Sequence, residues 1–236
     1  MYQINIGLDL ARVILVYVVY GIYGISYYFM ASKILRRDHN RVNYLLGAFY
    51  ISCGIGVIIN LIYTLIYIEI IVLILHYSSF FFLSLSLIFL FLFVLTLKKS
   101  EFIISLKTIV LILGIFSISV IGLCLIPDGV VINDSTGWIP DWSAVFAISV
   151  LIIHDLVIIP TIIYSIKMYR QFKDSMLKKK WKYFLIGIMG YFFLFYGTTI
   201  SHTLAEPIIR NIWSYVSILS LPFLYLIYSS IGKNLG

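Results

Sequence analysis

Long charge-free stretches alternate with short charged segments along the whole chain. Marking every Asp, Glu, Lys and Arg leaves seven apolar windows: 13–32, 42–68, 70–97, 108–127, 142–166, 183–205 and 211–232, with one carboxylate, Asp155, inside the fifth. Each window reaches the ~20 helical residues that a hydrocarbon core of about 30 Å requires. The windows show no alternation of polar and apolar positions, so they predict helices and not lipid-exposed strands.

The pattern therefore predicts an all-α, polytopic membrane protein, a seven-transmembrane helix bundle that forms one domain over residues 1–236. We expect its spans at about 8–32, 42–65, 70–97, 107–127, 142–167, 182–205 and 208–232. The first window is not typical of a cleaved signal, because Asp9 precedes it without a basic cluster and its apolar run is too long. We expect it to remain as the first span.

Amino-acid composition excludes several other classes of protein. Of the 236 residues, 62% are hydrophobic and 11% are charged, about half the charged share of a soluble domain. Mean hydropathy is +1.05. No stretch is polar enough to cover a water-facing globule, which excludes a catalytic or nucleic-acid-binding domain outside the membrane.

Charge is distributed very unevenly between the two faces of the predicted bundle. Alternating the connecting segments puts 15 of the 17 basic residues on one face and only Arg12 and Arg210 on the other. By the positive-inside rule the amino terminus lies outside and the carboxyl terminus inside. The net charge of +7 is then explained by topology, and it also attracts the chain to anionic lipid of the inner leaflet. It does not indicate binding to nucleic acid. We expect a multi-pass protein of the plasma membrane.

The inner segment 167–182 is the most basic of all, with seven Lys and Arg residues. Such a cluster attracts anionic headgroups or an acidic cytoplasmic signalling protein. The residues that we expect to make this contact are Lys173, Lys178, Lys179, Lys180 and Lys182.

The longest outer loop, 128–141, has turn residues at both ends and predicts a small lid or hairpin over the mouth of the bundle. It contains Asn133-Asp134-Ser135, a glycosylation sequon on the face where glycosylation takes place.

Asp155 is the clearest ionisable group inside a span. It follows Asp141 by fourteen residues, roughly 20 Å along a helix, which places it near the membrane midplane. One interpretation is a carboxylate in a water-filled pocket that binds a cation, a proton or an amine. The other is a protonated carboxyl group, hydrogen-bonded to a Ser or Tyr of a neighbouring helix. His154 is adjacent, but neighbours on a helix point about 100° apart.

Other polar groups gather in the outer half of the bundle and indicate a ligand-binding crevice open to the outside. The candidate residues are His76, His202, Arg12, Arg210, Asn60, Glu206 and Ser79. The alternative is local pairing at the membrane surface, Asp9 with Arg12 and Glu206 with Arg210.

Catalytic and metal-binding motifs are absent from the sequence. There is no HxxxH, HExxH or GxSxG pattern, so we expect neither an enzyme nor a cofactor, with a membrane-embedded metal hydrolase as the remaining catalytic alternative. Cys53 and Cys124 lie at different depths, which predicts packing roles and no disulfide. Gly187 and Gly190 predict close helix packing, and Pro222 predicts a kink in the last span.

Seven spans, an outer amino end, a basic segment between spans five and six, and the sequence Pro222-Phe-Leu-Tyr225 resemble the plan of rhodopsin-type and G-protein-coupled receptors. The last window has no lysine, so the resemblance does not extend to retinal attachment. In size and layout the chain is also similar to the seven-helix sensor region of prokaryotic histidine kinases, but it ends at Gly236, so no kinase is expected in cis. Seven-helix sugar porters share the orientation, but the paired prolines of their repeats are missing, since the first proline is Pro127.

These features together predict a sensor or receptor-like protein that takes a small ligand, ion or proton on the outside and signals through its basic inner face. The alternatives are a transporter or channel for a small solute or ion, and a membrane subunit that only scaffolds a partner.

Overall fold

The computed structural model describes residues 20–37, 39–99 and 104–232, and helices make up most of this part of the chain. The helices are α2 (Tyr20–Leu35), α3 (Arg41–Tyr63), α4 (Glu69–Lys99), α5 (Leu106–Leu123), α6 (Ala144–Gln171), α7 (Ser175–Leu204), α8 (Pro207–Val216) and α9 (Ser220–Ile227). The shorter elements are β1 (Val130–Val131), η2 (Asp134–Thr136), β2 (Asp141–Trp142), η3 (Ser217–Leu219) and the π-helical turn η4 (Tyr228–Gly232).

Six segments of this described part are long and apolar enough to cross a membrane: Arg41–Tyr63, Glu69–Lys99, Leu106–Leu123, Ala144–Gln171, Ser175–Leu204 and Pro207–Ser230. The chain is thus an all-α, multi-pass membrane protein, as its hydrophobic pattern predicts. Helix α2, with 16 residues, covers the later part of the predicted first span, 8–32. The earlier part of that span, with Arg12, lies outside the described residues.

Capping side chains set the starts of two long helices. Ser143 accepts a hydrogen bond from the Phe146 amide at 3.2 Å and starts α6. Asp174 accepts from the Leu177 amide at 2.7 Å and starts α7 at Ser175. Helix α7 therefore begins before residue 182, the predicted start of this span, because the cap carries the helix through the basic segment before the apolar window begins.

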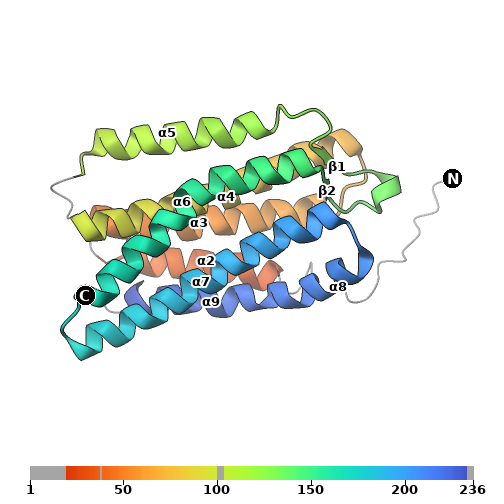
Figure 1. Ribbon diagram of the computed structural model, residues 1–236. Helices are drawn as coiled ribbons and strands as arrows, with labels where there is room; N and C mark the ends of the chain where they lie inside the picture. Colours follow the sequence, from red (N-terminus) through yellow and green to blue (C-terminus); the bar gives the residue numbers. More distant parts are fainter. Residues whose placement is uncertain (1–19, 38, 100–103, 233–236) are drawn as a thin grey trace.

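The helices form a bundle in which neighbours in sequence are also neighbours in space (Figure 1). Helix α3 packs against α2 and α4, α6 lies against α4 and α7, and α7 packs against α9. Helix α5 lies at the outer edge against α4 and α6, and few of its side chains are buried. The β1–β2 hairpin lies at one end of the bundle, the hairpin end, and the α6–α7 turn lies at the other (Figure 1).

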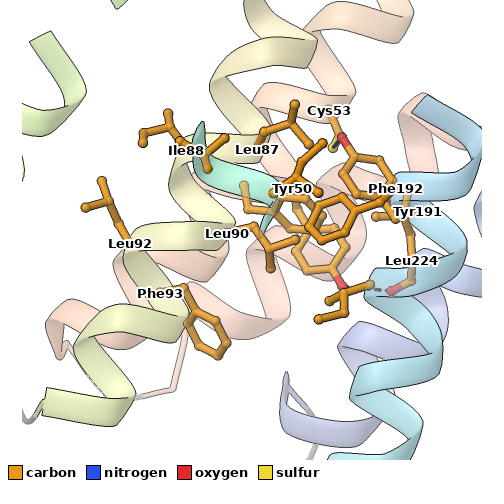
Figure 2. Packing of buried hydrophobic residues seen from close by; sticks show 14 of the residues in the cluster. Tyr50, Cys53, Leu87, Ile88, Leu90, Leu92, Phe93, Tyr191, Phe192 and Leu224 are labelled. Carbon is orange, nitrogen blue, oxygen red and sulfur yellow. Dashed lines mark hydrogen bonds between the residues drawn. The ribbon is translucent and has the colours of Figure 1, made fainter. Parts of the chain in front are cut away.

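Figure 2 shows the core where α3, α4, α7 and α9 meet. The Tyr50 hydroxyl donates to the Leu224 carbonyl at 2.8 Å. The Tyr191 hydroxyl lies 2.5 Å from the Ser86 hydroxyl and 3.7 Å from the Cys53 sulfur. Because lipid is as apolar as the core, such bonds between helices add to close packing in holding a membrane bundle together.

Small residues on α7 allow α9 to approach closely. A Cβ atom on Gly187 would lie 2.8 Å from the Phe223 carbonyl oxygen, and one on Gly190 would overlap the Phe223 ring. The packing role predicted for these two glycines is therefore confirmed.

The last span is one continuous helical segment made of α8, η3, α9 and η4, so the helical geometry changes near Pro222 within the single helix that the sequence predicts over 208–232. Pro222 has no amide hydrogen for the carbonyl four residues earlier, that of Ile218. The Tyr23 hydroxyl of α2 donates to this carbonyl instead, at 2.6 Å. A side chain from another helix thus replaces the missing backbone bond.

Candidate functional site

The hairpin that covers one end of the bundle is ordered by local hydrogen bonds. Its strands pair Val130 with Trp142, and the Ser143 amide donates to the Gly129 carbonyl at 3.0 Å. At its tip Asn133 and Thr136 form a capping box. The hairpin predicted for 128–141 is confirmed, whereas glycosylation of Asn133 stays a prediction.

Trp142 brings the hairpin into contact with two predicted histidines. Its indole Nε1 donates to His76 Nε2 of α4 at 3.3 Å, and its ring centroid lies 5.1 Å from that of His202 of α7. The two imidazole centroids are 6.4 Å apart. His76 and Trp142 are both buried, so three rings from three elements form one compact cluster.

Arg210 of α8 joins this cluster through the hairpin. Its Nη2 donates to the Pro140 carbonyl at 3.0 Å, and the His202 imidazole interacts with the same carbonyl. Asp141 is close enough to act electrostatically on the guanidinium, although the two form no ion pair in the described structure. We call His76, Trp142, His202 and Arg210 the hairpin-end cluster.

Two polar atoms of the hairpin-end cluster are buried without any hydrogen-bond partner: Arg210 Nε and His202 Nδ1. Buried polar groups are nearly always paired in folded proteins. These two atoms are therefore available to form hydrogen bonds with a bound ligand.

Three other predicted residues do not join the cluster. Ser79 is buried and donates to the Gly56 carbonyl of α3 at 2.8 Å, so it serves the packing of α3 on α4. Asn60 is half-buried on α3. Glu206 is exposed at the start of α8 and makes no capping bond. It also forms no ion pair with Arg210 within the described residues, so the predicted pairing of these two side chains is not formed.

A cavity of about 270 Å³ opens beside the hairpin, between α4, the end of α5 and β1. Its lining includes two exposed carboxylates, Glu69 and Asp128, together with Tyr77 and Cys124. Cys53 and Cys124 are both free. Residues 20–37, 39–99 and 104–232 contain no group of three or more His, Cys, Asp or Glu side chains placed to hold a metal ion.

Asp155 lies about halfway along α6 and faces α7. It is half-buried and accepts a hydrogen bond from the Tyr196 hydroxyl. His154 points elsewhere, as helical geometry predicts: it is fully buried, and its Nε2 lies 3.0 Å from the Ser84 hydroxyl of α4. This hydrogen bond from Tyr196 of a neighbouring helix is the contact that the second interpretation of Asp155 predicts.

The predicted inner contact residues surround the α6–α7 turn. Lys173, Lys178, Lys179 and Lys182 are exposed, and Lys180 is half-buried. Met176 and Leu177, which lie among them on α7, are 65% and 49% exposed. This mixture of basic and large apolar side chains suits the boundary between headgroups and acyl chains.

Sequence reasoning missed the part that Trp142 and Pro140 play. The signal was present, because Trp142 immediately precedes the Ser143 helix cap and so must lie at the mouth of the bundle. The sequence matches no protein-family model and no curated protein. The site must therefore be interpreted from its own chemistry.

Proposed function

We propose that this protein is a membrane-embedded sensor or receptor-like protein, which binds a small ligand at the hairpin end and signals through its basic inner face. The observation that carries the proposal is the hairpin-end cluster: polar side chains of α4, β2, α7 and α8 converge there, and two of their atoms are buried without a partner. Binding sites in helix bundles are typically built from a few convergent polar groups among apolar ones.

The proposal includes a topology. The chain crosses the membrane seven times, with α2 as the end of the first span, the amino terminus and hairpin outside, and the α6–α7 turn in the cytoplasm of a cell bounded by the plasma membrane. The 15 to 2 distribution of basic residues supports this orientation. In this topology the hairpin-end cluster lies at the outer side of the membrane, where a receptor binds its ligand.

Helix α7 connects the two ends. It carries His202 near its last turn and Lys178, Lys179 and Lys180 near its first, and its 30 residues span roughly 45 Å. A ligand that changes the packing of His202 would move the carboxyl end of α7. Because a long helix moves largely as a rigid body, its amino end, which contacts lipid or a cytoplasmic signalling protein, would move too. Such a ligand shifts the equilibrium only if it binds one position of α7 better than the other.

A transporter or channel for a small solute or ion is the second candidate, because Asp155 places a half-buried carboxylate about halfway along α6. Ion and proton pathways through membranes use such groups. A scaffold subunit without a ligand is the third.

The test uses the full chain reconstituted in lipid vesicles and a panel of amino acids, organic acids, sugars and inorganic ions. We expect one class to raise the thermal unfolding midpoint without accumulating in the vesicles. His202→Phe should abolish this shift, while Phe193→Leu, at an exposed site on the same helix, should not. Uptake of the bound compound would contradict the receptor in favour of a transporter. If no member of the panel binds, the result favours the third candidate, a scaffold subunit without a ligand.

A further inference from the structure

The two unpartnered atoms of the hairpin-end cluster differ in what they offer. Arg210 Nε carries a hydrogen at every physiological pH and can only donate. The interaction of the His202 imidazole with the Pro140 carbonyl favours the tautomer that carries its proton on the nitrogen facing that oxygen. In the neutral imidazole the remaining nitrogen, Nδ1, is then an acceptor.

The two side chains that carry these atoms are neighbours, because both interact with the Pro140 carbonyl. Arg210 Nη2 donates to Pro140 at 3.0 Å, and the His202 ring interacts with the same group. The site thus presents a cationic donor beside a neutral acceptor. The Trp142 ring, 5.1 Å from the His202 ring between centroids, borders them with an apolar surface.

We propose that the hairpin-end cluster binds a small monocarboxylic acid with an apolar body. One carboxyl oxygen accepts the hydrogen of Arg210 Nε, and the other shares the acid proton with His202 Nδ1. The proton either stays on the acid or moves to the imidazole, so that charge is conserved in both forms. This inference rests on the proposed function and specifies the ligand of that site.

Other ligand classes fit the two atoms less well. A metal ion or an amine is repelled by the guanidinium and leaves its Nε–H unpaired. A dianion such as phosphate meets only one free donor and also faces the carboxylate of Asp141, which acts on Arg210 from β2. A monocarboxylic acid that arrives with its proton adds no net charge to the site and is least opposed by that carboxylate.

The test measures binding of benzoate, benzamide and benzylamine to the full chain in neutral-lipid nanodiscs by thermal shift and by tryptophan fluorescence. The three probes share one ring and differ in charge. We expect benzoate to bind at least about tenfold more tightly than either analogue, the smallest difference that one hydrogen bond to a charged group typically makes.

Variants separate the cluster from the rest of the protein. We expect Arg210→Gln and His202→Phe each to weaken benzoate binding about tenfold or more, and Arg210→Lys, which keeps the charge but loses the Nε–H group, to weaken it as well. Arg170→Gln, an exposed arginine near the end of α6, is the matched control and should bind as the wild type does. A fluorescence spectrum like that of the wild type, without ligand, shows that each variant is folded.

Each other outcome overturns a stated part of the inference. If none of the three probes binds, the two atoms are hydrated and the ligand class is wrong. If benzamide or benzylamine binds as tightly as benzoate and His202→Phe removes that binding, the carboxylate is wrong, whereas the receptor proposal stands. If benzoate binds with the expected variant pattern but accumulates inside vesicles, the ligand class stands and the receptor proposal fails. Equal weakening by Arg170→Gln would contradict the location of the site.

Discussion

The Tyr196 hydroxyl donates a hydrogen bond to the Asp155 carboxyl group across the interface between α6 and α7. Both side chains are only half-buried, and the pair lies between the hairpin-end cluster and the basic α6–α7 turn along the two helices. It is therefore a polar contact that a relative movement of α6 and α7 would change.

We expect Asp155→Asn to abolish the ligand response while leaving the thermal unfolding midpoint nearly unchanged. Asn keeps the size and can still accept from Tyr196, but it cannot ionise. The response is the thermal shift produced by the active panel compound. Tyr196→Phe is the matched variant, since it removes the bond from the other side. A poorly folded Asp155→Asn protein whose purified remainder responds fully would make Asp155 a packing residue.

The proposed orientation predicts which end of the bundle is reached by a membrane-impermeant thiol reagent on intact cells. In a variant lacking Cys53 and Cys124, a cysteine replacing exposed Ser135 in the hairpin should be labelled. One replacing exposed Ser175 at the start of α7 should be labelled only after the membrane is permeabilised. The opposite pattern would invert the topology and place the hairpin-end cluster in the cytoplasm.

Charge neutralisation distinguishes lipid binding at the α6–α7 turn from a purely topological role. We expect replacement of Lys178, Lys179 and Lys180 by Gln to weaken association with anionic vesicles more than the same change at Lys98, Lys99 and Lys107. Each basic group near an anionic surface contributes about 1 kcal/mol at moderate salt. High salt should remove the difference, because these charges are exposed or partly exposed and are screened by ions. Equal effects of the two triplets would leave the segment no role beyond orientation.

We expect alanine to be tolerated at a glycine that faces open space but not at one in the α7–α9 contact. Gly190→Ala should lower the thermal midpoint, because the new methyl group overlaps the Phe223 ring, and overpacking of this kind typically costs about 1–3 kcal/mol. Gly114→Ala on α5 meets no atom within 4 Å and should be neutral or stabilising. The measurement is thermal unfolding in detergent. Equal midpoints would show that α9 is not seated on α7 in this way.

The Tyr23 bond predicts a specific coupling with Pro222. Tyr23→Phe should destabilise the protein by about 1 kcal/mol, because the Ile218 carbonyl loses its donor. In a Pro222→Ala background the restored backbone amide can bond that carbonyl, so the same change should matter much less. A double-mutant cycle measures the difference. Additive effects would mean that the hydroxyl does not substitute for the missing amide.

The spans follow from composition, because only long apolar windows satisfy the hydrocarbon core, and a window is visible without any knowledge of neighbours. Helix ends and breaks depend on single contacts. Asp174 sets the start of α7 through a capping hydrogen bond, which a hydropathy pattern cannot predict. The carbonyl that Pro222 leaves without a backbone donor is bonded by Tyr23, which is 199 positions away from Pro222 in the chain and whose role no local pattern reveals.

The candidate site was predictable in part for the same reason. His76, His202 and Arg210 are conspicuous because polar groups are rare in apolar windows, and the structure brings them together. Ser79 is equally conspicuous but bonds the α3 backbone, a choice that depends on the position of Gly56. The role of Pro140 arises from its backbone carbonyl, which every residue possesses and which no sequence pattern can single out.

The proline in the last span also has a consequence for biosynthesis. A helix interrupted by proline presents the bare carbonyl of Ile218 to hydrocarbon, where an unsatisfied backbone group costs several kcal/mol. Tyr23 and Tyr50, which bond the carbonyls of Ile218 and Leu224, belong to α2 and α3 and leave the ribosome long before this segment does. We therefore expect the final segment to insert against α2 and α3, which are already in the membrane, and not into lipid alone.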